Sequence, residues 1–167
     1  FYQTLGRDVM PHFDPLVHST KDVVQQAIIP LTARSRRSLA EDLMNQCATR
    51  PDKMITHNWS NLFRDLIAAV LADALDEESF AIVAFFLDTG QVDIIKKFLR
   101  DSGATERTYW ICAFSINQHI STCKRAKCEC GSSMISNDTP PLNLEGQSIP
   151  CEMNKFDDMM ELLAAIN

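Results

Sequence analysis

The segment TYWICAFSINQHISTCKRAKCECGSS, residues 108–133, joins an apolar strand pattern to a dense group of cysteines. Residues 109–114 form an almost unbroken apolar run, which is typical of a β-strand covered on both faces. One histidine and three cysteines follow between positions 119 and 130. We therefore expect a buried strand over residues 108–115 that leads into a cysteine-rich loop.

A second strand and a buried helix are predicted from KMITHNWSNLFRDLIAAVLADAL, residues 53–75. KMITH, residues 53–57, is the expected strand, and the polar turn THNW follows at its end. Ser60 has the side chain expected of a helix N-cap, and the helix after it is apolar on most sides. Strand, polar turn and buried helix form half of a βαβ unit, so the two predicted strands should be parallel neighbours.

Two further helices complete the predicted core. SFAIVAFFLDTG, residues 79–90, fits either a strand or a helix, and we predict a helix because QVDIIKKFLRDSG, residues 91–103, follows with clear helical periodicity. Gly103 is the expected C-cap of the second helix. The predicted fold class is α/β, a small and mostly parallel sheet flanked by helices, with too few strands for a complete doubly wound sheet. This domain spans residues 53–167 and carries a Cys/His loop insertion at residues 119–135.

Residues 1–52 are predicted to form a helical N-terminal extension that packs outside the sheet and carries no ligand. Ser19 precedes an apolar periodic segment that should end at Pro30. SLAE, residues 38–41, is a capping box and predicts a helix start. The apolar face predicted for that helix consists of Leu39, Leu43, Met44 and Cys47.

Composition and charge exclude some classes of partner. The chain has 167 residues, is 46% hydrophobic and 23% charged, and carries a net charge of −6. Nucleic acid and anionic membranes both favour a dense basic face, so neither is expected as the main partner. The basic cluster Arg34, Arg36 and Arg37 is interpreted as a solvated helix end. The longest apolar runs, LIAAVLA and FAIVAFFL, are too short to span a bilayer, so no transmembrane segment is expected.

The cysteines and the chain ends suggest a cellular setting. No secretory leader is visible, and four of the six cysteines fall in one region, which favours a reducing intracellular compartment, either the cytoplasm or an organelle interior. The abrupt termini and modest size indicate a subunit of a larger assembly, with other protein chains as partners.

Four ligand-type residues lie in the Cys/His loop with the spacing H-x3-C-x4-C-x-C: His119, Cys123, Cys128 and Cys130. Zinc binds four nitrogen and sulfur ligands tetrahedrally, and three cysteines with one histidine form a common structural set. Basic residues between the ligands would offset the charge of three thiolates. The alternatives are a redox pair or disulfide, or a loop without a special role, and Cys151 could replace one of the four ligands.

Polar residues follow both predicted strands at their carboxyl ends, where ligands bind in open α/β sheets. The small-ligand candidates are therefore His57, Asn58, Trp59, Asn117 and Gln118. The alternative is that these side chains tie loops together through hydrogen bonds. A Cys–His dyad between His57 and Cys112 is also conceivable, but a thiol within an apolar strand is generally inert.

Two segments, ITHNWSNLFRDLIAAV and YWICAFSINQH, resemble the TIR-like and heterokaryon-incompatibility (HET)-like domains. In those domains a first strand ends in an sHxW turn before a buried helix, and a later strand has the pattern W-[ILV]-D-x-[FL]-[SC]-[IV]-N-Q. Residues 53–167 are also similar to an uncharacterised group of algal proteins. The matching residues here are His57, Trp59, Trp110, Phe114, Ser115, Ile116, Asn117 and Gln118.

The resemblance implies a parallel α/β fold and, for the enzymes among those domains, hydrolysis of a nicotinamide nucleotide. Cys112 replaces the aspartate of the strand pattern, and Glu152 follows Cys151 without the tryptophan expected before a catalytic glutamate. We therefore predict a non-catalytic structural or protein-interaction module that is stapled by zinc. The alternative is a TIR-like enzyme that hydrolyses a nicotinamide nucleotide.

Overall fold

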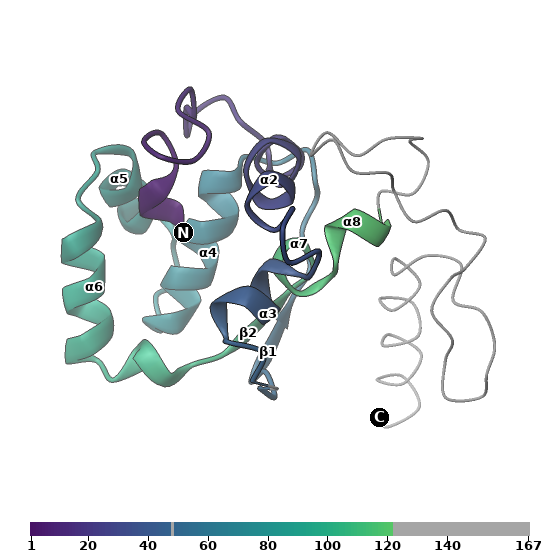
Figure 1. Cartoon of the computed structure of the whole chain (residues 1–167). Helices are drawn as coiled ribbons and strands as arrows, with labels where there is room; N and C mark the ends of the chain where they lie inside the picture. Colours follow the sequence, from purple (N-terminus) through teal and green to yellow (C-terminus); the bar gives the residue numbers. More distant parts are fainter. Residues whose placement is uncertain (48, 122–167) are drawn as a thin grey trace. The chain divides into compact units, whose positions relative to one another are not determined.

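The computed structural model describes residues 1–47 and 49–121 of the chain (Figure 1). Its α-helices are α1 (Thr20–Val23), α2 (Ile29–Leu31), α3 (Leu39–Leu43), α4 (Phe63–Ala74), α5 (Ala81–Asp88), α6 (Val92–Asp101), α7 (Cys112–Ser115) and α8 (Gln118–Ser121). The other elements are the 3-10 helices η1 (Tyr2–Thr4) and η3 (Ala104–Glu106), the π-helix η2 (Val24–Ile28), and the strands β1 (Lys53–Ile55) and β2 (Tyr109–Ile111). None of the helices within the described ranges is long and apolar enough to cross a membrane.

The chain forms two compact units. Among the described residues, the first comprises residues 1–27 and 49–113, and the second comprises residues 28–47 and 114–121. The sheet and the three longest helices belong to the first unit, whereas α3 and α8 belong to the second. The domain division that we predict after residue 52 stays a prediction.

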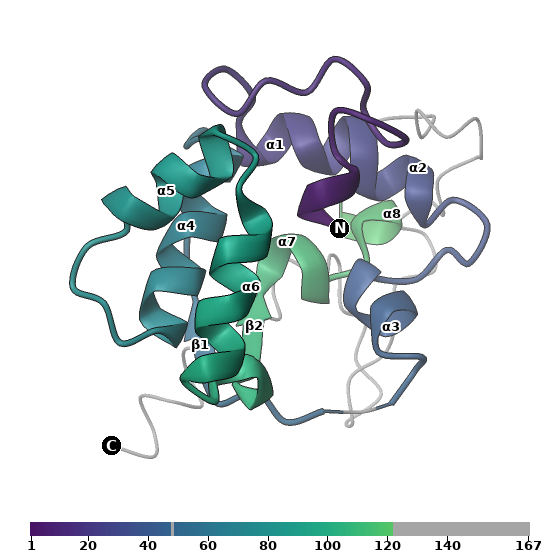
Figure 2. The same cartoon turned by 90° about the vertical axis from the view of Figure 1, so that its left-hand side faces the viewer.

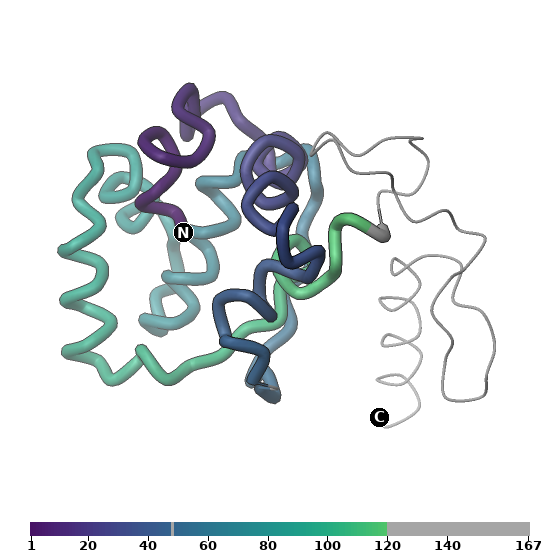
Figure 3. The backbone as a smooth tube through the Cα atoms, viewed as in Figure 1, coloured from purple at the N-terminus to yellow at the C-terminus, as the bar shows by residue number. Residues whose placement is uncertain are grey.

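Within the described residues the sheet consists of two parallel strands, as the half-βαβ pattern predicts. Lys53 pairs with Tyr109 and Ile55 pairs with Ile111. Figure 3 follows the chain from β1 through α4, α5, α6 and η3 into β2. The described part of the chain is therefore a mixture of helices and a small parallel sheet, which agrees with the predicted α/β class.

Both strands are shorter than predicted, and the second is followed by a helix. The expected strand over residues 108–115 is extended only from Tyr109 to Ile111, and Cys112–Ser115 form α7. An apolar run does not distinguish a strand from a buried helix. β1 ends at Ile55, opposite Ile111, so it offers the later residues no backbone partner, and a helical turn satisfies their polar groups within the segment.

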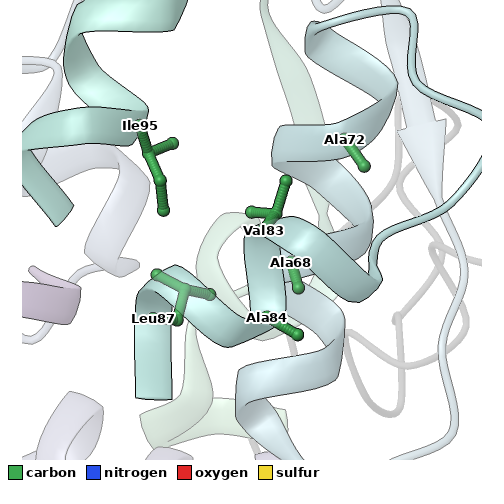
Figure 4. Packing of buried hydrophobic residues seen from close by; sticks show 6 residues of the cluster. All are labelled: Ala68, Ala72, Val83, Ala84, Leu87 and Ile95. Atoms are coloured by element: carbon green, nitrogen blue, oxygen red, sulfur yellow. The ribbon is translucent and has the colours of Figure 1, made fainter. Parts of the chain in front are cut away.

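The core of the first unit lies between α4, α5 and α6, which Figure 2 shows side by side. Alanines of α4 face α5 and let the two helix backbones approach closely. The buried cluster is labelled in Figure 4: Ala68, Ala72, Val83, Ala84, Leu87 and Ile95. The predictions of helices within residues 79–90 and 91–103 are confirmed by α5 and α6, and the residue after the Ser102 C-cap, Gly103, has the left-handed backbone expected there.

An aromatic cluster surrounds the first residue of α4. Phe63 is fully buried, and its ring lies 6.1 Å from the ring of Phe1 and 6.1 Å from that of Tyr2, centroid to centroid. Phe13 contacts Tyr2 and Phe63, with centroid distances of 5.8 and 6.4 Å. The first residues of the chain thus pack over the start of α4.

The start of α4 differs from the prediction. Ser60 is not its N-cap, because the helix begins at Phe63 after Leu62, which makes no side-chain capping bond. The backbone N–H of Ser60 instead donates to Asn58 Oδ1 at 2.8 Å, which forms an Asx turn. The burial of Phe63 at the first helical position replaces the missing cap as the feature that positions this helix end.

Pro30 does not end the N-terminal helical segment as predicted. Ser19 caps α1 in a capping box with Asp22, but the helical path continues through the π-helix η2 and past Pro30 to Leu31. Proline lacks an N–H and clashes with the carbonyl four residues earlier in a regular helix. The wider π turn just before Pro30 changes this hydrogen-bond register, so proline is tolerated there.

The capping box SLAE at residues 38–41 forms as predicted and starts α3. The predicted apolar face of this helix is wrong, because α3 ends at Leu43 and only Leu39 is buried. Leu43 is 58% exposed, Met44 is 41% exposed, and Cys47 is exposed. The two residues after Met44 have positive φ angles. The helix therefore ends there and has no second turn that could bury the rest of the predicted face.

Asp73 near the end of α4 connects this helix to both strands. Its carboxylate accepts hydrogen bonds from Lys53 Nζ of β1 at 2.9 Å and from the Tyr109 hydroxyl of β2 at 2.7 Å. Burial, together with this hydrogen bond, raises the pKa of Tyr109 to about 12. The hydrogen bonds from Tyr109 and Lys53 lower the pKa of Asp73. Asp73 thus holds the end of α4 against the sheet.

α4 ends in a Schellman motif built on an aspartate. Asp76 has a φ of 58°, in the left-handed region that favours glycine, and the N–H of Glu77 donates to the Ala72 carbonyl at 2.9 Å. The Asp76 carboxylate also accepts two hydrogen bonds from Arg107, at 2.8 and 2.6 Å. The side chain therefore compensates for an unfavourable backbone conformation.

We expect Asp76→Ala to destabilise the chain more than Asp76→Gly. Both variants remove the carboxylate that binds Arg107, but only alanine keeps the steric penalty of a left-handed backbone. The Tm of Asp76→Ala, measured by circular dichroism, should therefore be lower than that of Asp76→Gly by roughly 2–4 °C. Equal Tm values for the two variants would show that the ion pair alone stabilises this helix end.

Candidate functional site

The carboxyl end of the sheet brings together His57 and Cys112. His57 follows β1 by two residues, and Cys112 directly follows β2. Cys112 Sγ lies 3.8 Å from both Nδ1 and Nε2 of His57, and both side chains are half-buried. The Trp59 ring lies 5.8 Å from the His57 ring, centroid to centroid. This is the position at which open α/β sheets bind ligands.

The contact between the two side chains is not a directed hydrogen bond. The two ring nitrogens of an imidazole point in divergent directions, so a sulfur equally far from both lies in line with neither. A distance of 3.8 Å to each nitrogen therefore describes a sulfur that packs against the His57 ring. In this geometry His57 cannot take the Cys112 proton without a change of rotamer.

The electrostatics also disfavour a catalytic dyad. Burial raises the pKa of the Cys112 thiol, against the smaller lowering by the backbone N–H groups of Ala113 and Cys112 itself. Burial lowers the pKa of His57. A nucleophilic cysteine beside histidine needs the opposite shifts, toward thiolate and imidazolium. His57 and Cys112 are therefore both neutral near pH 7.

We expect the Cys112 thiol to react slowly with alkylating reagents. Its raised pKa and half-burial both reduce the amount of accessible thiolate, whereas Cys47 is exposed. Iodoacetamide at pH 7 should modify Cys112 at least roughly tenfold more slowly than Cys47, as followed by peptide mass spectrometry. The two rates should converge in urea, and faster labelling of Cys112 in the folded chain would contradict this assignment.

The five small-ligand candidates fall in two places. His57 and Trp59 lie together in the first unit, where Asn58 is exposed and Asn58 Oδ1 accepts the turn hydrogen bond described above. In the second unit, Asn117 Nδ2 donates to the Arg36 carbonyl at 2.8 Å, and Asn117 Oδ1 accepts from the His119 N–H at 3.0 Å. Gln118 is only 2% exposed. Asn117 therefore connects the segment of Arg36 to the segment of His119 within the second unit.

His119 is the one predicted zinc ligand among the described residues. It is 1% exposed, and its Nε2 lies 2.9 Å from Thr32 Oγ1. Cys123, Cys128 and Cys130 lie outside the described residues. Within residues 1–47 and 49–121, no group of three or more histidine, cysteine, aspartate or glutamate side chains could hold a metal ion.

Sequence reasoning missed the partner of His119. Thr32 is 1% exposed and lies 87 positions before His119, just after α2. A buried threonine after a helical segment is a weak signal, because its hydroxyl commonly donates to a carbonyl one turn back, as it does here to Ile28 at 2.8 Å. No periodicity in the sequence connects it to the loop.

No protein-family model, curated protein or solved structure matches this chain. The resemblance to TIR-like and HET-like domains therefore stays a prediction carried by the segments at residues 55–70 and 109–119.

Proposed function

We propose that the chain is a non-catalytic protein-interaction module that works within a larger protein or assembly. The proposed contact surface consists of three residues of α5 and one of α6: Ile82, Phe85, Phe86 and Phe98. We call this surface the outer face. The partner is a different protein that covers this face with apolar side chains.

The observation that carries this proposal is the exposure of large apolar side chains on the outer face. Ile82 is 65% exposed, Phe85 is 58% exposed and Phe98 is 44% exposed. The ring of Phe86 connects them, with centroid distances of 5.9 Å to Phe85 and 6.3 Å to Phe98. Phe86 itself is partly buried and packs against the core cluster. Ile82 and Phe85 lie one turn apart on α5, so these side chains form a group rather than scattered single residues.

α5 is apolar on both of its faces. Val83, Ala84 and Leu87 face the core with α4 and α6, while Ile82 and Phe85 point away from it. A helix that is apolar on all sides is normally buried on all sides, because burial of each such side chain contributes roughly 1.5–3 kcal/mol. Contact with a partner protein would remove this surface from water.

The test compares two double variants of the purified chain. Ile82→Asn with Phe85→Asn alters the outer face, and Leu16→Asn with Val17→Asn is the control, because Leu16 and Val17 are 62% and 66% exposed. A partner found by cross-linking is purified and titrated against each chain. We expect saturable binding by the wild-type and control chains, and at least roughly 30-fold weaker binding by the outer-face variant.

Equal affinity of the two variants would overturn the outer face as the contact surface. Sedimentation of the wild-type chain alone is the second measurement. A concentration-dependent dimer that only the outer-face variant abolishes would show that a second copy covers this face, which would contradict a different protein as the partner.

The neutral pair of His57 and Cys112 supports the non-catalytic part of the proposal. Their pKa shifts are opposite to those that activate a nucleophile. The alternative prediction, a TIR-like enzyme, is tested by incubating the chain with a nicotinamide nucleotide and measuring released nicotinamide. Turnover that persists through purification to homogeneity would overturn the non-catalytic assignment.

We also propose that zinc staples the Cys/His loop through His119, Cys123, Cys128 and Cys130. The spacing H-x3-C-x4-C-x-C supports a set of three thiolates and one imidazole. The hydrogen bond between His119 Nε2 and Thr32 Oγ1 also supports it, because zinc-bound histidines usually donate their second ring N–H to a fixed oxygen. Elemental analysis of chain purified without added metal should give zinc near one equivalent. A value near zero, with unfolding indifferent to chelators, would remove the site.

A further inference from the structure

Two of the four histidines of the chain lie next to each other before the start of α1. The rings of His12 and His18 are 5.5 Å apart, centroid to centroid, in an edge-to-face arrangement. His18 directly precedes Ser19, the N-cap of α1, and His12 lies in the loop before it. Two imidazoles that bind one metal ion, each through a nitrogen about 2.0–2.1 Å from it, have ring centres on the order of 5 Å apart. The spacing of the two rings therefore suits a shared metal ion.

His12 has one ring nitrogen fixed by a hydrogen bond and one that is open to a ligand. Its Nε2 lies 2.6 Å from Oε1 of Gln26, a residue of η2. An amide oxygen only accepts, so Nε2 carries the proton and Nδ1 is the basic nitrogen. No described residue forms a hydrogen bond with Nδ1. His12 is exposed, so a metal ion can reach this nitrogen from solvent.

His18 also has one nitrogen that the protein holds and one that it leaves open. The Asp14 N–H lies 2.9 Å from Nδ1 and donates to it when Nδ1 is basic. The Asp14 carbonyl lies 3.2 Å from Nδ1 and accepts from it when Nδ1 carries the proton. The ring proton can therefore move from Nε2 to Nδ1 without leaving Nδ1 unpaired. Nε2 has no hydrogen-bond partner among the described residues, and the ring of Phe13 stacks on that of His18 with centroids 5.9 Å apart.

We propose that His12 Nδ1 and His18 Nε2 together bind a divalent transition-metal ion. Imidazole suits zinc, nickel and copper, whereas magnesium and calcium need oxygen ligands. The Gln26 and Asp14 oxygens orient the two ligands through their second ring nitrogens, as the outer partners of metal-bound histidines do.

The remaining coordination positions are filled by water. Within the described ranges no group of three or more histidine, cysteine, aspartate or glutamate side chains could hold a metal ion, so the two histidines act as a pair. The ion would join the loop before α1 to the start of that helix. It would also place a ligand in the N-terminal segment, for which the sequence predicts none.

The test titrates nickel(II) alone into the full-length chain with 15N-labelled histidine, near pH 7.5. Nickel is the probe because, unlike copper(II), it does not oxidise cysteine thiols, and its unpaired electrons broaden the resonances of nearby nuclei. We expect the ring resonances of His12 and His18 to broaden together, saturably and at sub-millimolar nickel, and magnesium to leave both unchanged. Broadening of only one of the two rings, or of neither below millimolar nickel, would overturn the proposal.

Single variants show whether the two histidines act as a pair. His12→Asn should weaken nickel binding at His18 by at least roughly tenfold, because one ligand of the pair is lost, and His18→Asn should do the same at His12. His57→Asn is the control and should leave both affinities unchanged. A backbone amide spectrum checks that each variant is folded. His12 is exposed, so His12→Asn keeps the test decisive if His18→Asn does not fold. Unchanged affinity at His18 in His12→Asn would show two independent histidines and would overturn the site.

Discussion

Phe63→Ala should lower the free energy of unfolding by about 3–5 kcal/mol, the loss typical of a buried phenylalanine. Phe63 is fully buried at the first position of α4, and the rings of Phe1, Tyr2 and Phe13 all pack on it. Removing it leaves a cavity that these three rings line and that α4 cannot close alone. Urea unfolding followed by circular dichroism measures the change.

Two further variants separate the cavity from a general effect of losing an aromatic ring. Phe63→Leu keeps most of the buried volume, so it should lower the free energy of unfolding by much less than Phe63→Ala. Phe85→Ala removes a ring that is 58% exposed and should change the unfolding free energy little. A small loss for Phe63→Ala would mean that the N-terminal residues do not hold α4 as the structure shows.

Ile95→Ala should lower the free energy of unfolding by about 2–5 kcal/mol, because it removes a fully buried side chain from a closely packed cluster. Ile95 is 1% exposed and contributes α6 to the core that α4 and α5 form through Ala68, Val83 and Leu87. The alanines of α4 have no long side chain that could move into the cavity, so the cavity left by Ile95→Ala would stay largely open. The same urea titration measures this loss.

Phe98→Ala is the matched control on the same helix. Phe98 is 44% exposed and belongs to the outer face. Phe98→Ala should therefore lower the free energy of unfolding by much less than Ile95→Ala does. A larger loss for Phe98→Ala than for Ile95→Ala would show that α6 packs through the opposite face. It would also remove Phe98 from the proposed contact surface.

Helices in the first unit could be predicted where periodicity was clear. The spacing predicts that Val92, Ile95, Phe98 and Leu99 share one face of α6. Ile95 lies in the buried cluster and Val92 and Leu99 pack against it, whereas Phe98 is 44% exposed, so that part of the prediction is wrong. The capping box predicted at residues 38–41 also forms, because it depends only on neighbouring residues. These features are local, so the sequence contains the physical information that determines them.

Features that depend on distant contacts could not be predicted. The apolar run at residues 109–114 is compatible with strand or helix, and the end of β1 decides where β2 stops. Ser60 is a good cap in isolation, but the burial of Phe63 sets the helix start. In the candidate site, the contact of His57 with Cys112 follows from the prediction that their two strands are parallel neighbours, whereas the contact of Thr32 with His119 follows from no sequence pattern.

The parallel pairing of β1 with β2 has a consequence for the order of folding. Lys53 pairs with Tyr109, 56 positions later along the chain, and closing a loop of that length costs roughly 3–4 kcal/mol of chain entropy. The contacts of α4 with α5 and of α5 with α6 join neighbouring segments and close much shorter loops. The three helices should therefore assemble before the strands meet.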